Sequence, residues 1–407
     1  MAYTGASVAS TLGNVLKDVY TGTVVEQLNN EVLITQRLER DTVDFSGNQL
    51  VYSVHKQRSA GVFARAENVQ FANPGAQLYA KPVYDVKSLY GRIRVTGLGR
   101  VKTAKDAGAF LRVLEGEISG IKNDLKMDLA RQLYGTGNGV IATTDTSGSG
   151  VVVTLQSAEA IRKGELYIGM IVDIGTLADP DSQCASRSIT DVSIANLTIT
   201  VDGANFVTTD GTHFVSREGN NTDSSVTYEV SGLQQLVSTA AGSFGGIDAS
   251  AAGNSYWDNQ RLNASGALSL DLLTQSFNTV DVQGGNVSAM ISSPGMQRAL
   301  FNLLQSQVRY TEPMNLKGGF KALEYMGQPF IADRQAPFGK VYFLDEKFLN
   351  IIDAGDWDWL NEDGNILKWV VGYDAWEAVL ARYMNLSAKR RNTQLVLYGL
   401  TNDTTGV

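Results

Sequence analysis

The chain has 407 residues, which is long enough for two or three domains with substantial cores. Hydrophobic residues make up 43% of it, as in soluble globular proteins, and no run of about 18 apolar residues could span a bilayer. The net charge of −8 argues against general affinity for nucleic acid, because phosphate contacts need clustered Lys and Arg. The only cysteine, Cys184, excludes an internal disulfide framework and fits a reducing compartment. Residues 1–20 lack the continuous apolar stretch of a secretion signal.

The first 40 residues contain a helical spacing of apolar side chains that continues to Leu38, which predicts an N-terminal arm with a short helix. Two β-favouring stretches follow, at Leu50–Arg58 and Val83–Val95. Asn73-Pro74-Gly75 lies between them and predicts the turn of a long hairpin. A two-stranded ribbon is marginally stable in water, so a hairpin without its own core indicates that a neighbour holds it.

The same region is strongly basic. Residues 49–105 carry two acids, Glu67 and Asp85, and ten bases: Lys56, Arg58, Arg65, Lys81, Lys87, Arg92, Arg94, Arg100, Lys102 and Lys105. The local balance is +8, so the remainder of the chain carries −8 − 8 = −16. A basic arm on an acidic body could be drawn to the body of another copy. The alternative is an ordinary solvated charged hairpin. Its aromatic residues form no motif for nucleic-acid binding.

A long amphipathic helix is predicted after the hairpin. Apolar residues recur at intervals of three and four from Leu111 to Leu133, which places them on one helical face. Thr103 or Asp106 could cap its start, and Gly135 ends it.

Residues 140–230 change to short β-like runs separated by turns such as Asp202-Gly203 and Asp210-Gly211, which predicts an inserted small β-barrel or sandwich. Further along, helices are expected at 268–280 and 294–305, with proline opening the second. Strands are expected at 289–292, 340–344, 348–352 and 394–398, and residues 369–381 fit a helix or a strand.

No pattern typical of catalysis or of a cofactor or metal site is found. His55 and His213 have no second ligand at zinc spacing. The glycine-rich stretch 135–139 follows a helix, whereas phosphate-binding loops connect a strand to a helix. Residues 253–257 lack the closing glycine of a nucleophile elbow. We therefore expect a protein without enzymatic activity, cofactor or bound metal.

An acidic segment near the C-terminal end contains Asp353, Asp356, Asp358, Glu362 and Asp363, interleaved with Trp357 and Trp359. Leu360 occupies a ligand position of the calcium-loop pattern, so a calcium site is not expected. Two interpretations stay open. The segment is either a solvated acidic edge or a docking surface for a basic arm, and the tryptophans would suit a partly buried contact.

The order of several short motifs resembles one protein family. They are Leu133-Tyr134-Gly135-Thr136-Gly137, then Gly232-Leu233, Gly245-Gly246-Ile247-Asp248, Tyr256-Trp257, Gly372-Tyr373-Asp374 and Tyr383-Met384-Asn385-Leu386-Ser387. Together with the arm, the hairpin and the long helix, they resemble the major capsid proteins of tailed bacteriophages with the HK97 fold. The resemblance covers nearly the whole chain apart from residues 140–230.

The resemblance implies an α+β fold with seven parts. These are an N-terminal arm (1–47), an extended hairpin called the E-loop (48–96), a peripheral domain with a spine helix (97–139), the inserted β-rich domain (140–231), the continued peripheral domain (232–284), an axial domain (285–370), and a C-terminal segment returning to the peripheral domain (371–407).

The implied function is self-assembly into hexamers and pentamers of an icosahedral phage head that encloses double-stranded DNA. The expected partners are other copies of the chain, a separate scaffolding protein, a portal protein, a possible decoration protein and packaged DNA. No membrane is involved, and the place of action is the virion, assembled in the host cytoplasm. One alternative is an encapsulin-type nanocompartment shell. Another, of a different class, is a carbohydrate-binding virion surface protein, for which the insertion offers only Tyr167, Phe206, Phe214 and Tyr228.

The residues expected at contacts between subunits are the basic hairpin side chains and the acidic segment: Lys56, Arg58, Arg65, Lys81, Arg92, Arg94, Asp353, Asp356, Trp357, Asp358, Glu362 and Asp363. Some similar proteins cross-link a loop lysine to a neighbour's asparagine. Lys56 or Lys81 could be placed for this reaction, but no motif identifies the partner.

Overall fold

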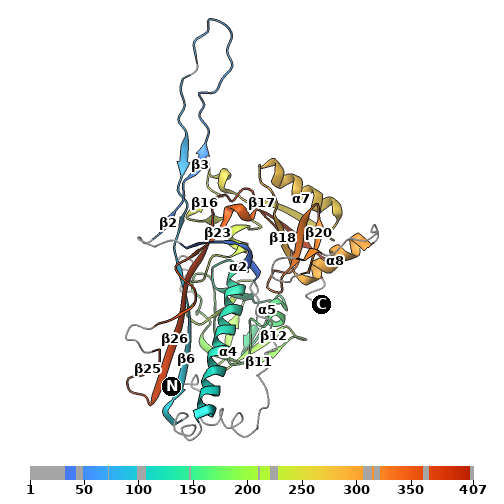
Figure 1. Cartoon of the computed structure of the whole chain (residues 1–407). Coiled ribbons are helices and arrows are strands. Elements are labelled where there is room, and N and C mark those ends of the chain that lie inside the picture. The colour runs from blue at the N-terminus through green and yellow to red at the C-terminus, as the bar shows by residue number, and fades with distance from the viewer. Residues whose placement is uncertain are drawn as a thin grey trace.

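The computed structural model describes residues 33–42, 49–71, 73–98, 107–145, 148–209, 211–220, 228–305, 314–315, 321–360 and 366–403 (Figure 1). Helices and sheets occur together, and the described apolar side chains gather in three separate cores. The α+β class expected from the sequence is therefore confirmed.

The first core lies around a long antiparallel ribbon. Strand β6 (Lys87–Thr96) pairs with β26 (Ala375–Ala388) over its full length, from Thr96 opposite Ala375 to Lys87 opposite Met384. The same sheet contains β1 (Glu39–Thr42), β23 (Leu349–Asp353), β24 (Asp358–Trp359) and β25 (Lys368–Trp369). Helix α2 (Leu33–Arg37) precedes β1, and Arg37 pairs with Glu346 at 2.6 Å.

Helix α4 (Ala107–Tyr134) lies along this ribbon, as Figure 1 shows. Leu125, Leu129 and Leu133 are buried, as their spacing predicts, and Gly135 follows the last residue of the helix. The predicted caps, Thr103 and Asp106, lie outside the described residues. Strand β6 approaches the helix closely at Gly91, where a β-carbon would stand 2.4 Å from a methyl carbon of Leu125. The absence of a side chain there lets the helix lie flat on the strand.

The inserted β-rich region has its own core. Six strands form an antiparallel sheet in the order β7 (Val140–Thr143), β14 (Phe214–Arg217), β10 (Ile171–Gly175), β11 (Cys184–Ser193), β12 (Thr198–Val201) and β9 (Val152–Thr154). A bridge between Thr144 and Leu155 joins the two ends of this order, so the sheet closes on itself as a small barrel. Strands β8 (Gly148–Gly150) and β13 (Phe206–Thr208) form a separate pair, and α5 (Glu159–Lys163) packs its Ile161 into the barrel core.

The third core belongs to a seven-stranded mixed sheet. Its strands follow the order β17 (Gln260–Gly266), β27 (Leu395–Leu400), β22 (Val341–Leu344), β18 (Ala289–Ser292), β21 (Gln328–Ala332), β20 (Lys321–Tyr325) and β19 (Met314–Asn315). Helices α7 (Leu270–Val282) and α8 (Pro294–Gln305) pack on it. Ser269 caps α7 by accepting a hydrogen bond from the Leu272 amide at 3.2 Å.

Short elements connect the cores. They are α6 (Leu233–Leu236), β15 (Ser243–Phe244), β16 (Ile247–Asp248) and the 3-10 helices at Ser255–Trp257 and Glu346–Phe348.

The hairpin differs from the sequence prediction in two ways. We call residues 49–84 the projecting hairpin; it contains β2 (Leu50–Val51), β3 (Val54–Gln57), β4 (Leu78–Ala80) and β5 (Val83–Tyr84), which pair β2 with β5 and β3 with β4. The prediction that Val83–Val95 forms one arm is wrong from residue 87 onward, because β6 pairs with β26 on the body of its own chain. The basic side chains Arg92 and Arg94 therefore lie on the ribbon.

The turn was also predicted in the wrong place. The register pairs His55 with Tyr79, and the chain turns at Glu67 and Asn68, where Asn68 takes a φ of 60°. Gly75 instead lies on the returning arm, where a β-carbon would stand 2.5 Å from the Ala60 nitrogen. The glycine allows the two arms to approach each other and does not form the turn. Residues 369–381, which fitted a helix or a strand, form the pair β25 and β26.

Candidate assembly surfaces

The base of the projecting hairpin is fixed to the body of the chain. The Val83 amide donates to the Gly245 carbonyl at 2.9 Å, and the Tyr84 hydroxyl donates to the Ala388 carbonyl at 2.9 Å. Gly245 has a φ of 60°, and a β-carbon on it would stand 2.8 Å from the Tyr84 ring. Glycine is therefore needed where the hairpin leaves the body.

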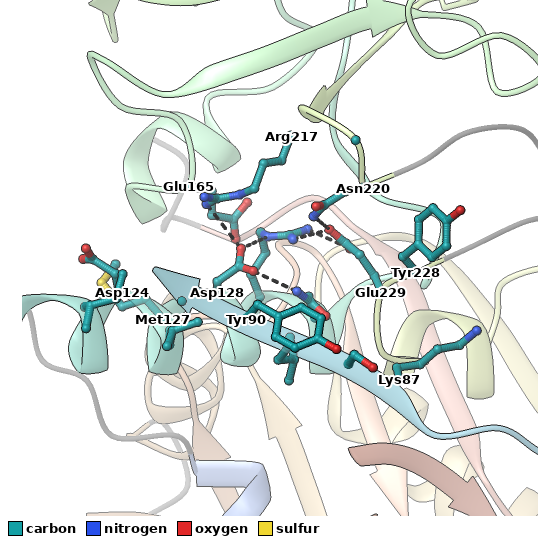
Figure 2. Close-up of a pocket in the computed structure, with 18 of the residues that line it drawn as sticks. Lys87, Tyr90, Asp124, Met127, Asp128, Glu165, Arg217, Asn220, Tyr228 and Glu229 are labelled. Atoms are coloured by element: carbon teal, nitrogen blue, oxygen red, sulfur yellow. Dashed lines mark hydrogen bonds and ion pairs between the residues drawn. The ribbon is translucent and has the colours of Figure 1, made fainter. Parts of the chain in front are cut away.

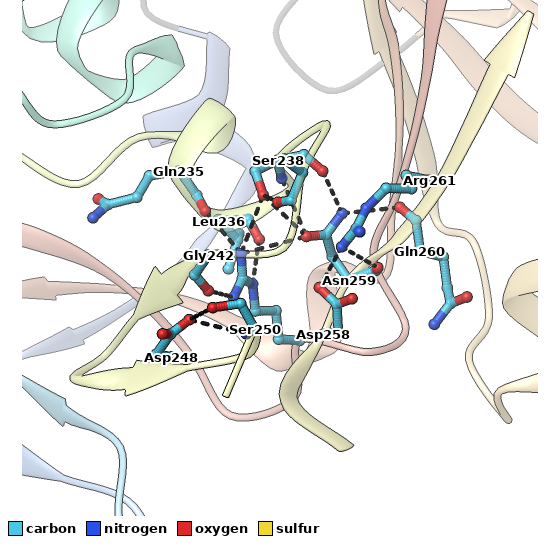
Figure 3. A network of polar contacts seen from close by, with 12 residues as sticks. Gln235, Leu236, Ser238, Gly242, Asp248, Ser250, Asp258, Asn259, Gln260 and Arg261 are labelled. Atoms are coloured by element: carbon cyan, nitrogen blue, oxygen red, sulfur yellow. Dashed lines mark hydrogen bonds and ion pairs between the residues drawn. The ribbon is translucent and has the colours of Figure 1, made fainter. Parts of the chain in front are cut away.

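A buried arginine holds the segment next to this base. The guanidinium of Arg391 donates to the carbonyls of Leu236, Gly242 and Gln235 at 2.7, 2.8 and 3.1 Å. Figure 3 shows these three acceptor residues. It also lies 3.3 Å from the side-chain oxygen of Asn259. Burial lowers the pKa of Arg391 to about 10. The converging acceptors compensate for lost hydration and fix the segment that continues into β15, just before Gly245.

Lys56 occupies a special position in the hairpin. The register of β3 and β4 shifts between His55 and Gln57, which is a bulge at Lys56. Its ammonium lies 3.3 Å from the side-chain oxygen of Asn254 and 5.6 Å from the centre of the Tyr256 ring. Lys56 therefore contacts its own body, whereas Arg58, Arg65 and Lys81 are exposed.

Beyond Lys56 the hairpin leaves the body and extends into solvent (Figure 1). Among the described residues, no side chain in 49–80 is buried. Several large apolar side chains are exposed, including Val62 at 89% and Phe71 at 77%. Phe63 and Phe71 contact each other across the two arms, with ring centres 5.7 Å apart, and Arg65 lies 5.7 Å from the Phe63 ring. A contiguous exposed apolar cluster of this kind marks an interaction surface.

The two predicted bases on the ribbon have partners within their own chain. Arg92 forms a salt bridge with Glu377, and the guanidinium of Arg94 lies 4.5 Å from the centre of the Tyr373 ring. Half of the Arg92 side chain stays exposed. A contact with another subunit would therefore compete with these internal contacts.

The acidic segment divides into buried and exposed members. Asp353 is buried, and its carboxylate pairs with Arg382 at 2.5 Å, so the prediction that it presents charge to another copy is corrected. Asp356 is 75% exposed at its side chain, and Asp358 is exposed in β24. Trp357 packs partly against the first core. Glu362 and Asp363 lie outside the described residues.

A groove of about 1170 Å³ separates the barrel from the ribbon and helix α4. Its walls come from residues 85–92, in and just before β6, residues 121–132 on α4, and three stretches of the insertion and the segment after it: 164–167, 217–220 and 228–229. Gln335 completes the lining. Figure 2 shows Tyr90 and Lys87 on one side, and Arg217 and Asn220 on the opposite side. The groove therefore joins segments that are distant in the sequence.

A network of ion pairs forms the floor of this groove. Arg131 donates two hydrogen bonds to Glu229, at 2.5 and 3.1 Å, and one to Asp128 at 3.1 Å. Arg217 of the barrel approaches Asp128 to 3.5 Å. Burial would raise the pKa of Asp128, but the nearby Arg131 and Arg217 hold it below its ordinary value. These charges attach the barrel to the helix.

Glu165 also lines this groove. Among the described residues its carboxylate has no hydrogen-bond or salt-bridge partner, although Lys163 and Arg131 are near enough to act on it electrostatically. Burial raises the pKa of Glu165 to about 7, against the opposing effect of these two cations.

Sequence reasoning missed the groove and the apolar hairpin cluster. The charge count pointed to the basic side chains only. The signal that could have revealed the cluster is that Val62, Phe63 and Phe71 are apolar and lie on a segment predicted to lack a core. The aromatic cluster that the carbohydrate-binding alternative needs is not formed, since Phe206 is buried and only Tyr167 and Tyr228 are exposed.

Two further findings concern the described part of the chain. No group of three or more His, Cys, Asp or Glu side chains there could hold a metal ion. None of the described helices is both long and apolar enough to cross a membrane.

Comparison with known proteins gives a likeness in fold. No family model matches the chain in sequence, and no curated protein matches it either. The structure of the cyanophage A-1(L) capsid asymmetric unit aligns with a TM-score of 0.60 at 12% identity, over 97% of this chain and 100% of that one. The capsid of a native GTA particle aligns with a TM-score of 0.51 at 8% identity, over 97% and 98%. A holo encapsulin complex from Synechococcus elongatus aligns with a TM-score of 0.47 at 11% identity, over 98% and 97%.

The two higher-scoring alignments cover nearly all of both chains, so they include the ribbon, the long helix and the mixed sheet in one arrangement. The chain therefore has the fold of phage capsid proteins.

Proposed function

We propose that this chain is a major capsid protein that assembles into hexamers and pentamers of an icosahedral bacteriophage head around double-stranded DNA. The observation that carries the proposal is the projecting hairpin, which exposes Val62, Phe63 and Phe71 on a segment with no core of its own. A single copy leaves this surface in water, whereas a closed shell supplies every hairpin with a neighbour. The fold likeness to phage capsids, with a TM-score of 0.60, supports the same conclusion.

The proposed mechanism is repeated self-association without catalysis. Each hairpin lies over an adjacent copy, the mixed sheet with α7 and α8 contacts its equivalents around the centre of a hexamer or pentamer, and charge complementarity sets the register. Arg58, Arg65 and Lys81 are exposed on the hairpin, and Asp356 and Asp358 are exposed on the body, so these charges are available for contacts between copies. Lys56, Asp353 and Trp357 support the subunit from within.

The proposed partners are a separate scaffolding protein, a portal protein, possible decoration proteins and DNA held by non-specific contacts. The proposed place is the virion, after assembly in the host cytoplasm. If shells with uniform size form from the chain expressed alone, a separate scaffolding protein is not needed and that part of the proposal fails.

The experiment is co-expression of the chain with the genes that flank it, followed by sedimentation and electron microscopy. We expect closed particles that protect double-stranded DNA from nuclease. Particles that contain a protein cargo and no protected DNA would support a nanocompartment instead. Chains that sediment as monomers in every combination would contradict shell assembly.

A further inference from the structure

The barrel is attached to two other parts of the same chain. The ion pair of Arg217 with Asp128, at 3.5 Å, joins it to α4. Its helix α5 joins it to residues 333–338, which connect β21 to β22 of the mixed sheet and which we call the linking loop. Figure 1 shows α5 on the side of the barrel that faces the mixed sheet. The barrel therefore contacts the helix and the sheet at the same time.

The contact between α5 and the linking loop consists of directional polar bonds, which we call the clamp. The Lys163 ammonium donates to the Gln335 carbonyl at 2.9 Å, and the Arg334 guanidinium donates to the Lys163 carbonyl at 2.9 Å. The Phe338 amide donates to the Glu159 carboxylate at 3.3 Å, and Lys163 donates to the same carboxylate at 2.6 Å. Because Lys163 is only 4% exposed, water competes little for its bonds.

The direct contact between α4 and the mixed sheet is built on apolar packing. Leu133 and Tyr134 form the end of α4 and lie in the first core. Tyr342 and Leu344 of β22 lie in the same core. The Tyr134 hydroxyl adds a hydrogen bond to Asp333 at 2.7 Å. Apolar attraction has no preferred direction, and packed layers can slide past each other by small amounts, so this contact fixes the angle less firmly than the clamp does.

Two buried oxygen atoms at this junction have no hydrogen-bond partner among the described residues. They are the side-chain oxygen of Gln335 in the linking loop and the hydroxyl of Tyr342 in β22. Tyr342 is near enough to both Tyr134 and Glu159 to interact with them electrostatically. A buried polar group without a partner is unfavourable, so a shift of the sheet that gave these atoms a partner would be favoured. The clamp opposes such a shift.

We infer that the barrel is a brace: by binding α4 and the linking loop together, it holds the mixed sheet in one arrangement on α4. Without the clamp, the sheet shifts on α4 while each of the three cores stays intact. A closed shell repeats one subunit shape many times, so a change in this arrangement changes the curvature of the shell. The brace therefore also sets the shell diameter, and this second part of the inference rests on the proposed function.

The first test loosens the clamp and measures the arrangement within the single chain. Arg334→Ala removes an exposed donor of the clamp, and the double variant, Arg334→Ala with Lys163→Met, removes both side-chain donors. Spin labels are attached at Lys126→Cys in α4 and Arg298→Cys in α8, which are exposed positions, in a Cys184→Ala background. Pulsed electron paramagnetic resonance then gives the distribution of distances between the two labels.

The original chain should give one narrow distribution of distances. The double variant should widen it at least about 2-fold, and Arg334→Ala alone should widen it less. The matched control is Arg187→Ala, which removes arginine bonds to the carbonyls of Asp202 and Ala204 inside the barrel and should leave the width unchanged. Arg334→Lys, which keeps a donor, should stay close to the original.

An equally narrow distribution in the double variant, or equal widening in the Arg187→Ala control, would overturn the brace. Circular dichroism and urea unfolding check that each variant folds. Arg334→Ala changes only an exposed side chain. If the double variant does not fold, an unchanged width in Arg334→Ala decides against the brace.

The second test measures the diameter of shells obtained by co-expression with the flanking genes. Electron microscopy should show one diameter for the original chain and several for the double variant. Uniform shells from a variant with a widened distance distribution would overturn the link between the brace and shell diameter. If the original chain forms no shells at all, the proposed function fails, and the distance measurement still decides whether the barrel is a brace.

Discussion

The projecting hairpin and the barrel are both built from short strands, yet only the barrel completes its own core. In the barrel, Val172, Ile174 and Val215 are fully buried, and the bridge between Thr144 and Leu155 joins its two ends. In the hairpin, none of the described residues from 49 to 80 is buried. Closing a sheet removes its free edges, whereas a two-stranded ribbon leaves both edges and both faces exposed.

This difference separates the stability of a subunit from its ability to assemble. Substitutions in the barrel should act on the folding of the single chain. Substitutions in the hairpin beyond Lys56 should leave the single chain intact and act on the contact with a neighbour. The predictions that follow test this separation, from the largest expected effect to the smallest.

The largest effect is expected from removing the outer part of the hairpin. Replacing residues 58–77 with Asn-Gly, which forms a tight turn between strands, should abolish shell formation. The free energy of unfolding of the single chain should change by less than about 1 kcal/mol, because no buried contact is lost. Sedimentation and urea unfolding measure the two quantities. A normal yield of shells from this variant would contradict the proposed separation of subunit stability from assembly.

A large loss of stability is expected at the attachment of the barrel to α4. Arg131→Met leaves the buried carboxylate of Glu229 without its ion-pair partner and should cost about 3 to 5 kcal/mol of unfolding free energy. The control is Arg92→Ala, which removes a half-exposed pair with Glu377 and should cost no more than about 1 kcal/mol. Equal losses of unfolding free energy in the two variants would show that burial of the ion-pair network does not increase its contribution to stability.

The barrel core should respond to cavity formation. Ile174→Ala removes buried methyl groups and should cost about 2 to 4 kcal/mol in chemical denaturation. Val62→Ala on the hairpin should stay within about 0.5 kcal/mol, since its side chain is 89% exposed. We expect the opposite for shell yield, which Val62→Ala should lower more than Ile174→Ala does. A larger loss from Ile174→Ala in both assays would contradict the separation of subunit stability from assembly.

The last expected effect concerns pH. The pKa of Glu165 is raised from 4.5 to about 7, so the folded chain holds this proton more tightly than the unfolded chain between these values. Stability should therefore fall as pH rises from 4.5 to 7, and Glu165→Gln should flatten that slope. Burial also raises the pKa of Asp333, which gives a slope of the same sign in both proteins. The difference between the two melting curves isolates Glu165, and identical slopes would argue against its perturbed titration.

Local patterns in the sequence predicted several elements well. The spacing of Leu125, Leu129 and Leu133 gave one face of α4, and Pro294 marked the first residue of α8. Pro74-Gly75 was misleading because a glycine permits either a turn or a close approach, and only the register shows that Gly75 lies opposite Ala60.

The assembly surfaces were harder to predict. Arg92 and Arg94 followed the β pattern of the hairpin, but their strand pairs with β26, almost 300 residues later in the chain. The groove combines residues from the ribbon, α4 and the barrel, and no local pattern links them. Charge counting identified the basic hairpin, but the ion pair of Asp353 with Arg382 could be found only from the three-dimensional contact.

Electron cryo-microscopy of the native particle that contains this chain tests the central claim most directly. The account predicts an icosahedral shell with the chain at hexameric and pentameric positions, and with residues 62–71 of each copy lying on an adjacent copy. A particle in which the chain occupies no such lattice, or in which these residues remain in solvent, would contradict it.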